Sequence, residues 1–210
     1  LLPLCAHVLR YRECGKEFVH AQLSVAEEVE LAEKAFSNWR RTSIGYRSDC
    51  LKRLADLLES NRDDLIAQLV SEAKKTIPDS LAEVREAVDF CRFYAARAKS
   101  LQKETELPGP TGETNVHRYV PRGAWAAISP WNFPLAIFLG QATAALVTGN
   151  TVVAKAAPQT PVIARFARKL AIEAGIPEES FRLVEGGAPE GRSLVEDRRI
   201  RGVVFTGSTA

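Results

Sequence analysis

Hydrophobic residues in the first half of the chain recur at the three- and four-residue spacing of amphipathic helices. Ser24 and Glu27 form a capping-box pattern, and the apolar positions of the helix predicted after it are Val25, Val29, Ala32, Phe36 and Trp39. A second helix is predicted around Leu51, Leu54, Leu57 and Leu58. Asp63 and Asp64 favour the start of a third, with Leu65, Ile66, Leu69 and Val70 on its inner face. Pro78 suits the first turn of a fourth, whose inner positions are Leu81, Val84, Val88, Cys91 and Ala95.

The second half of the chain alternates short apolar strands with helices. Residues 107–112 (LPGPTG) form a proline- and glycine-rich break, and residues 117–120 are predicted to form a short strand. Further strands are predicted over 124–129, 151–154, 181–184 and 202–205, and helices over 135–147, 161–174 and 192–196. This alternation indicates an α/β fold with a parallel sheet that has helices on both faces. The almost wholly apolar strands fit a sheet that is buried on both sides.

These patterns divide the chain into four segments. Residues 1–23 are a leader that the patterns do not place, residues 24–106 are helical, residues 107–122 hold the break and a β segment, and residues 123–210 form a βαβ region. The first ten residues have no leading basic region and no small-residue cleavage site, so we predict no signal peptide. The chain begins without Met, and we therefore expect the natural start to lie upstream.

Composition and charge narrow the class of partner. The hydrophobic fraction of 46%, the charged fraction of 26% and the net charge of +2 are ordinary for a soluble globular protein. Lys and Arg are interspersed with acidic residues, so we expect neither a nucleic-acid partner nor an anionic membrane surface. No apolar run reaches the ~18 residues that a membrane span needs.

The cysteines predict a reducing compartment and no metal site. The four of them form no C-x-x-C pair, which favours reduced thiols in a cytoplasmic protein. A zinc site could draw on the ligand types of Cys5, His7, Cys14 and His20. Their spacing matches no known zinc-finger pattern, so we predict that they bind no metal.

The first candidate for chemistry is the segment ISPWNFPL, residues 128–135, where a predicted strand meets its helix. Ligands of open α/β sheets bind at such junctions. Pro130 and Pro134 restrict the backbone on either side of Asn132, whose amide can donate to an oxygen that becomes negative during a reaction. The alternative is that Asn132 only hydrogen-bonds its own loop.

Two further strand ends carry candidate binding groups. Lys155 ends a predicted strand and could bond a ribose or a phosphate, although a lysine at a strand end is more often simply solvated. Thr206, Gly207 and Ser208 follow the last strand at a predicted helix N-terminus, where free backbone N–H groups suit a pyrophosphate. The alternative there is a plain turn with Ser or Thr as the N-cap. The chain has no G-x-G-x-x-G fingerprint.

SPWNFP, a strand that ends in Lys155, and FTGS, in this order, resemble the landmarks of the aldehyde dehydrogenase superfamily. Residues 129–141 (SPWNFPLAIFLGQ), 81–90 (LAEVREAVDF) and 107–113 (LPGPTGE) are similar to the 1-pyrroline-5-carboxylate (glutamate-semialdehyde) dehydrogenase module of the bifunctional proline utilisation A proteins. The resemblance covers roughly residues 24–210. It implies a truncated, Rossmann-like NAD-binding domain.

The resemblance also implies roles for individual residues. Asn132 would be the catalytic oxyanion-hole amide, and Phe133 would pack beside the aldehyde chain. Glu86 matches a position that touches the amino group of the substrate. The NAD-binding positions would be Ile128, Ser129, Pro130, Trp131, Lys155, Gly207 and Ser208. Among them, Lys155 would bond the adenosine ribose and Ser208 would hold the pyrophosphate.

The implied full-length protein oxidises L-glutamate γ-semialdehyde to glutamate with NAD in proline catabolism. In the family a cysteine thiolate attacks the aldehyde, hydride passes to NAD, and a water activated by a glutamate cleaves the thioester. We expect a homo-oligomer, with residues 107–120 in a β-flap. The chain leaves open whether a proline dehydrogenase module lies upstream.

Three departures qualify the resemblance. The catalytic Cys and Glu of the family lie beyond FTGS, so we expect residues 1–210 alone to be inactive and, with an unpaired sheet edge, poorly soluble. Ala156 and Pro158 stand where the family usually has Pro and Glu, and the missing carboxylate removes an acceptor for the ribose. Lys74 replaces a common Gly. The alternatives are a dehydrogenase for another aldehyde and a non-catalytic module that binds nucleotide or stabilises a larger protein.

Overall fold

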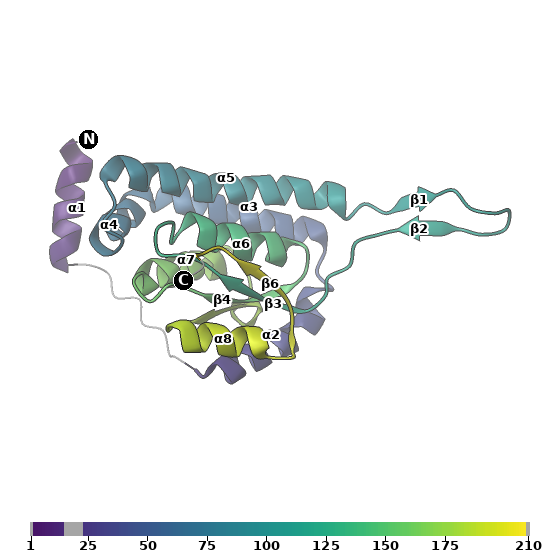
Figure 1. The fold of residues 1–210 in the computed structure, drawn as a ribbon. Coiled ribbons are helices and arrows are strands. Elements are labelled where there is room, and N and C mark those ends of the chain that lie inside the picture. Colours follow the sequence, from purple (N-terminus) through teal and green to yellow (C-terminus); the bar gives the residue numbers. More distant parts are fainter. Residues whose placement is uncertain (1, 15–22, 209–210) are drawn as a thin grey trace.

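The computed structural model describes residues 2–14 and 23–208. Its helices are α1 (Leu2–Cys14), α2 (Val25–Trp39), α3 (Ile44–Ser60), α4 (Arg62–Glu72), α5 (Ile77–Leu101), α6 (Ala136–Val147), α7 (Pro161–Glu173) and α8 (Ala188–Glu196). Its strands are β1 (Thr105–Leu107), β2 (Asn115–His117), β3 (Ala124–Ile128), β4 (Thr151–Lys155), β5 (Phe181–Val184) and β6 (Ile200–Phe205). A short 3-10 turn, Glu178–Ser180, precedes β5. The mixed α/β class predicted from the sequence is confirmed (Figure 1).

Local capping explains where the helices of the first half begin. Ser24 accepts the backbone N–H of Glu27, and the Glu27 carboxylate accepts the N–H of Ser24 at 2.8 Å, which is the predicted capping box. Ser43 caps α3, and Thr76 caps α5 one residue before its first turn, which contains a proline as predicted. Side-chain acceptors therefore satisfy N–H groups that have no partner inside these helices.

The central sheet is parallel, with strand order β5-β4-β3-β6. Its side chains contribute to two hydrophobic cores, one on each face, because successive residues of a strand point to opposite faces. Ala127, Val152 and Ala154 face the larger core, which includes residues of α3, α5, α6 and α7. Ala126 and Val153 face a smaller core with Val29 of α2 and Leu194 of α8. Helices therefore cover both faces, as predicted.

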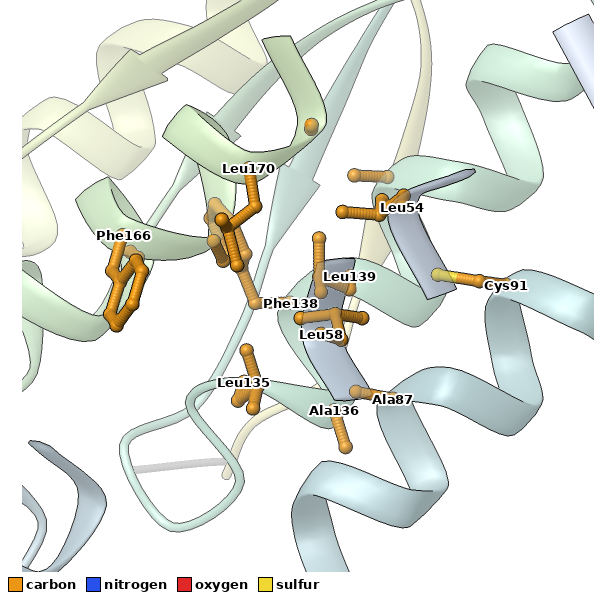
Figure 2. Packing of buried hydrophobic residues seen from close by; sticks show 14 of the residues in the cluster. Leu54, Leu58, Ala87, Cys91, Leu135, Ala136, Phe138, Leu139, Phe166 and Leu170 are labelled. Carbon is orange, nitrogen blue, oxygen red and sulfur yellow. The ribbon is translucent and has the colours of Figure 1, made fainter. Parts of the chain in front are cut away.

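Helices α3, α4 and α5 form a layer, called the helical layer below, and the larger core joins this layer to the sheet (Figure 2). Leu54 and Leu58 of α3 and Cys91 of α5 lie close to Leu139 of α6. Of the positions predicted to face inward, Val25, Phe36, Leu57, Val70 and Leu81 are only half-buried. Leu57, Val70 and Leu81 pack against the larger core, and Val25 packs against the smaller one.

Three predicted boundaries are wrong. The predicted strand over 117–120 is instead β2, Asn115–His117, which pairs antiparallel with β1 and ends at the Thr105↔His117 pair, so residues 118–120 have no strand beside them. Helix α8 begins at Ala188 rather than at residue 192, because Glu190 accepts the N–H of Gly187 at 2.7 Å and stabilises an extra first turn. Strand β6 begins at Ile200, two residues before the predicted start at residue 202.

Two regions lie beside the sheet and the helices that cover it. The β1–β2 hairpin projects away from them, and its side chains are almost all exposed (Figure 1). The unplaced leader contains α1, which packs on α4 and buries Val8 and Tyr11. His7 Nε2 lies 2.8 Å from Asp64 Oδ1. In the part of the chain described, no helix is long and apolar enough to span a membrane.

Candidate active site

The carboxyl ends of β3, β4 and β6 bring the predicted site residues to one edge of the sheet. Ile128 pairs in register with Lys155 on one side and with Phe205 on the other. The N–H of Ser129 donates to the carbonyl of Lys155 at 3.3 Å, and the N–H of Thr206 donates to the carbonyl of Ile128 at 3.0 Å. The segments that carry Asn132, Lys155 and Ser208 thus begin at neighbouring strand ends.

The loop that carries Asn132 is anchored at both ends and exposed at its tip. Ser129 and Pro134 are buried, whereas Trp131 is 55% exposed and Phe133 38%. The side-chain amide of Asn132 is exposed and makes no hydrogen bond with any residue that the structure describes. Its backbone carbonyl instead accepts from Lys75 Nζ at 3.0 Å. The amide therefore does not stabilise its own loop and is available to a ligand.

A buried carboxylate from the helical layer holds the other end of this loop. Glu83, on α5, is 1% exposed, and its Oε1 accepts the N–H groups of Leu135 at 2.8 Å and Ala136 at 3.2 Å. These groups begin α6, whose own N-cap residue is Leu135 and supplies no side-chain acceptor. Glu83 Oε2 lies 2.5 Å from Lys75 Nζ. The Lys75 ammonium also lies 4.1 Å from the centre of the Phe133 ring.

Lys155 lies in a cleft rather than in solvent. It is 7% exposed, so burial lowers the pKa of its ammonium, while the charge of Glu190 acts in the opposite direction. The cleft has a volume of about 520 Å³ between the strand ends and α8. Its walls are mostly apolar, with Ile128, Val203 and Phe205 from the strands and Gly187 and Gly191 from the start of α8.

The last predicted binding segment is in place but has no helix in the described residues. Gly207 and Ser208 are exposed and follow β6 without regular structure. The helix expected there would continue into residues 209 and 210, which lie outside the described residues. The amide of Gln141, oriented to satisfy its neighbours, donates to the carbonyl of Ile128 at 3.1 Å and accepts from Thr206, so it ties β3 to the start of this segment.

Glu86 lies on α5 and is exposed. It is three residues after Glu83, which contacts the start of α6, and four residues before Phe90, which contacts Gly140 of α6. Residues at these spacings share a helix face, so Glu86 points from the same side of α5 as the support of the Asn132 loop.

Two of the cysteines, Cys50 and Cys91, are unsuited to act as nucleophiles. Cys50 and Cys91 are fully buried in the helical layer. Burial raises the pKa of the Cys50 thiol and raises that of Cys91 to about 12, so both stay protonated at neutral pH. Of the zinc candidates, His20 and the side chain of Cys14 lie outside the described residues. Across residues 2–14 and 23–208, no group of three or more His, Cys, Asp or Glu side chains could hold a metal ion.

Sequence reasoning missed Lys75 and Glu83 as parts of this site. Lys75 is 57 residues from the carbonyl that it holds, and Glu83 is 52 residues from the N–H group of Leu135. The only available signal was the position of Glu83 one residue before Val84, a predicted core position, on the buried side of its helix.

Comparison with known proteins agrees with the geometry. Residues 15–210 match the aldehyde dehydrogenase family. The chain is 43% identical to the bifunctional protein PutA of Klebsiella aerogenes, over 90% of this chain and 14% of that protein. It is 39% identical to the 1-pyrroline-5-carboxylate dehydrogenase of Geobacillus thermodenitrificans, over 95% of this chain and 38% of that protein. The chain thus spans well under half the length of these curated relatives.

Solved structures show the same fold. A variant of proline utilisation A from Bradyrhizobium japonicum superposes with a TM-score of 0.90 at 48% identity, over 98% of this chain and 21% of that one. A variant of 1-pyrroline-5-carboxylate dehydrogenase from Thermus thermophilus superposes with a TM-score of 0.83 at 36% identity, over 87% of this chain and 36% of that one. The chain belongs to the aldehyde dehydrogenase family.

Proposed function

We propose that this chain is the front part of an NAD-dependent dehydrogenase that oxidises L-glutamate γ-semialdehyde to glutamate in the cytoplasm. The observation that carries the proposal is the exposed, unpaired amide of Asn132 on a loop anchored beside the Lys155 cleft. The relatives named 1-pyrroline-5-carboxylate dehydrogenase suggest the substrate class. The net reaction converts the aldehyde, NAD⁺ and water to a carboxylate, NADH and two protons.

The cleft fits a dinucleotide. Its apolar walls suit a flat base, and a buried ammonium can donate to ribose hydroxyls or to a phosphate. Lys155 would bind the adenosine ribose, and residues 128–131 and 207–208 would approach the rest of the cofactor. The cofactor supplies a hydride acceptor. Pro158 adds no carboxylate for the ribose, so we expect weaker binding than in relatives that carry Glu there.

Asn132 would donate its amide to the aldehyde oxygen as that oxygen becomes negative. A donor of this kind contributes roughly 3–4 kcal/mol in acyl-transfer enzymes. Phe133 would line the path of the aldehyde chain, and Glu86 would attract the substrate amino group. The attacking cysteine and the glutamate that activates water would come from sequence after residue 210, where the resemblance to the family places them. Cys50 and Cys91 are buried and protonated and would not take that role.

Two parts of the proposal concern assembly. The exposed β1–β2 hairpin is a means by which the full-length protein would form homo-oligomers. The relatives named as bifunctional suggest a proline dehydrogenase module in the same polypeptide as the aldehyde dehydrogenase module.

The test is the reduction of NAD by the full-length protein with glutamate semialdehyde and, separately, with propanal and benzaldehyde. We expect turnover with glutamate semialdehyde to exceed that with the other two. Preference for an uncharged aldehyde would identify a dehydrogenase of another substrate class. Retained NAD binding without turnover of any aldehyde would identify a non-catalytic module.

A further inference from the structure

The N-termini of α6 and α7 are capped in the same way from the helical layer. Neither N-cap residue, Leu135 or Thr160, bonds the helix with its own side chain. Glu83 accepts the N–H groups at the start of α6, and Glu72 accepts those of Val162 at 2.7 Å and Ile163 at 2.9 Å at the start of α7. A carboxylate at a helix N-terminus satisfies free donors and interacts favourably with the helix dipole.

The α6 cap differs from the α7 cap because it includes Lys75. The ammonium of Lys75 bridges the Glu83 carboxylate and the carbonyl of Asn132, and its side chain is 12% exposed. It also contacts the face of the Phe133 ring. A single cation therefore links the cap of α6 to the backbone carbonyl of Asn132 and to the ring of Phe133.

This arrangement fixes the Asn132 loop from two directions. Glu83 fixes the residues after the loop tip through two backbone N–H groups, and Lys75 fixes the tip through one carbonyl. The peptide group after Asn132 is one of the two that flank its Cα, so the Lys75 contact restricts the direction of the Cα–Cβ bond and with it the orientation of the amide. Lys75 lies in the break between α4 and α5, and Glu83 lies in α5, so neither belongs to the sheet that carries the loop.

We propose that Lys75 and Glu83 are positioning residues that orient the Asn132 amide for the developing oxyanion. The inference rests on the proposed function. It predicts that loss of Lys75 lowers kcat more than it changes the KM for the aldehyde or the Kd for NAD, because ground-state binding does not need the same alignment as the transition state. Misplacement of a catalytic group by about 1 Å can reduce the rate on the order of 100-fold.

The experiment compares full-length wild type with Lys75→Met, Lys75→Arg, Glu83→Gln and the matched control Glu72→Gln. We expect Lys75→Met to lower kcat roughly 10- to 100-fold and Lys75→Arg, which keeps the cation, to restore most of it. Glu83→Gln and Glu72→Gln should lower the Tm by similar amounts, since each weakens one cap. Only Glu83→Gln should also lower kcat.

A second measurement does not depend on turnover. Amide hydrogen exchange of a peptide covering residues 129–137 should accelerate in Lys75→Met and Glu83→Gln, while a peptide covering residues 160–165 should not. Glu72→Gln should show the reverse pattern. If the full-length wild type oxidises no aldehyde, the proposed function fails, and this exchange pattern still tests whether the pair holds the loop.

Three results would overturn the inference. The first is an unchanged kcat in Lys75→Met together with an increased KM for the aldehyde, which would make Lys75 a substrate-binding residue. The second is equal loss of kcat in Glu83→Gln and Glu72→Gln, which would reflect general destabilisation. The third is unchanged exchange over residues 129–137 in every variant.

Discussion

Asn132 and Lys155 are two of the polar groups on which the proposed activity depends, and the fold presents them in opposite ways. Asn132 is exposed on a loop, and its amide has no partner among the residues that the structure describes. Lys155 is a strand residue with 7% exposure, and burial lowers the pKa of its ammonium. The orientation of Asn132 comes from contacts with the helical layer, whereas the position of Lys155 comes from the register of β3 and β4.

Asn132 should therefore have little effect on the free energy of unfolding, whereas Lys155 should lower it in the free protein. An exposed amide stays hydrated until a ligand arrives, so its removal should change the reaction and leave folding unchanged. The Lys155 ammonium has lost much of its hydration, and the charge of Glu190 offsets that loss only in part until a ligand supplies acceptors. Its removal should therefore stabilise the free protein and weaken binding.

The largest expected effect is that of Asn132→Ala in the full-length protein. We expect kcat to fall on the order of 100- to 1,000-fold, because the oxyanion loses its donor. The Kd for NAD and the Tm should stay the same, as measured by titration and thermal unfolding. An unchanged kcat would exclude the assigned role.

Lys155→Met should produce the opposite combination. We expect the Kd for NAD to rise by roughly tenfold or more, the effect of losing a hydrogen bond from a charged group. The free energy of unfolding without NAD should increase on the order of 1 kcal/mol, because an apolar side chain replaces a desolvated charge. Tighter NAD binding in this variant would contradict the comparison.

The same variant has a pH signature. The pKa of Lys155 is lowered in the folded state from its ordinary value of 10.5, so the unfolded chain binds more protons between the folded pKa and 10.5. In that window the contribution of Lys155 to the free energy of unfolding rises with pH. Chemical denaturation at a series of alkaline pH values should show this rise in wild type and a smaller one in Lys155→Met.

Pro158→Glu tests whether the Lys155 side of the site lacks an acceptor for the ribose of NAD. An added carboxylate could accept from a ribose hydroxyl, and about 1 kcal/mol of binding corresponds to roughly a fivefold lower Kd for NAD. Pro158→Gln is the matched control without the charge. Kinetic constants that depend on Asn132 should not change, and a lower affinity for NAD in Pro158→Glu would contradict the prediction.

The smallest effect is expected at Lys74, which precedes the residue that holds Asn132. Lys74 has a φ of +57°, a left-handed conformation that is unfavourable for a residue with a Cβ. Lys74→Gly should increase the free energy of unfolding by about 0.5 kcal/mol, the relief of strain less the greater chain entropy of glycine. Urea denaturation measures the change, with Lys74→Ala as the control that keeps the strain. A destabilised Lys74→Gly variant would show that the strain is compensated locally.

Periodicity and motif spacing predicted much of the body of the fold. Short β-branched and apolar runs such as residues 151–154 predict buried parallel strands, because side chains on both faces of such a run face a core. The β1–β2 hairpin was misplaced because it is exposed on both faces, so no alternation of polar and apolar residues marks its register. The Ser24–Glu27 capping box and the proline in the first turn of α5 were also predicted, since such signals lie within a few residues of the helix start.

The sequence by itself determined the α/β class, the order of most elements and the strand ends that carry Asn132, Lys155 and Ser208. Only the tertiary structure decided that Lys155 is buried and that Lys75 and Glu83 lie beneath the Asn132 loop. The physical reason is the separation along the chain of the residues that interact. Periodicity and caps depend on neighbours within one or two helical turns, whereas burial and the contacts of a side chain with a distant backbone exist only after α5 has packed against α6.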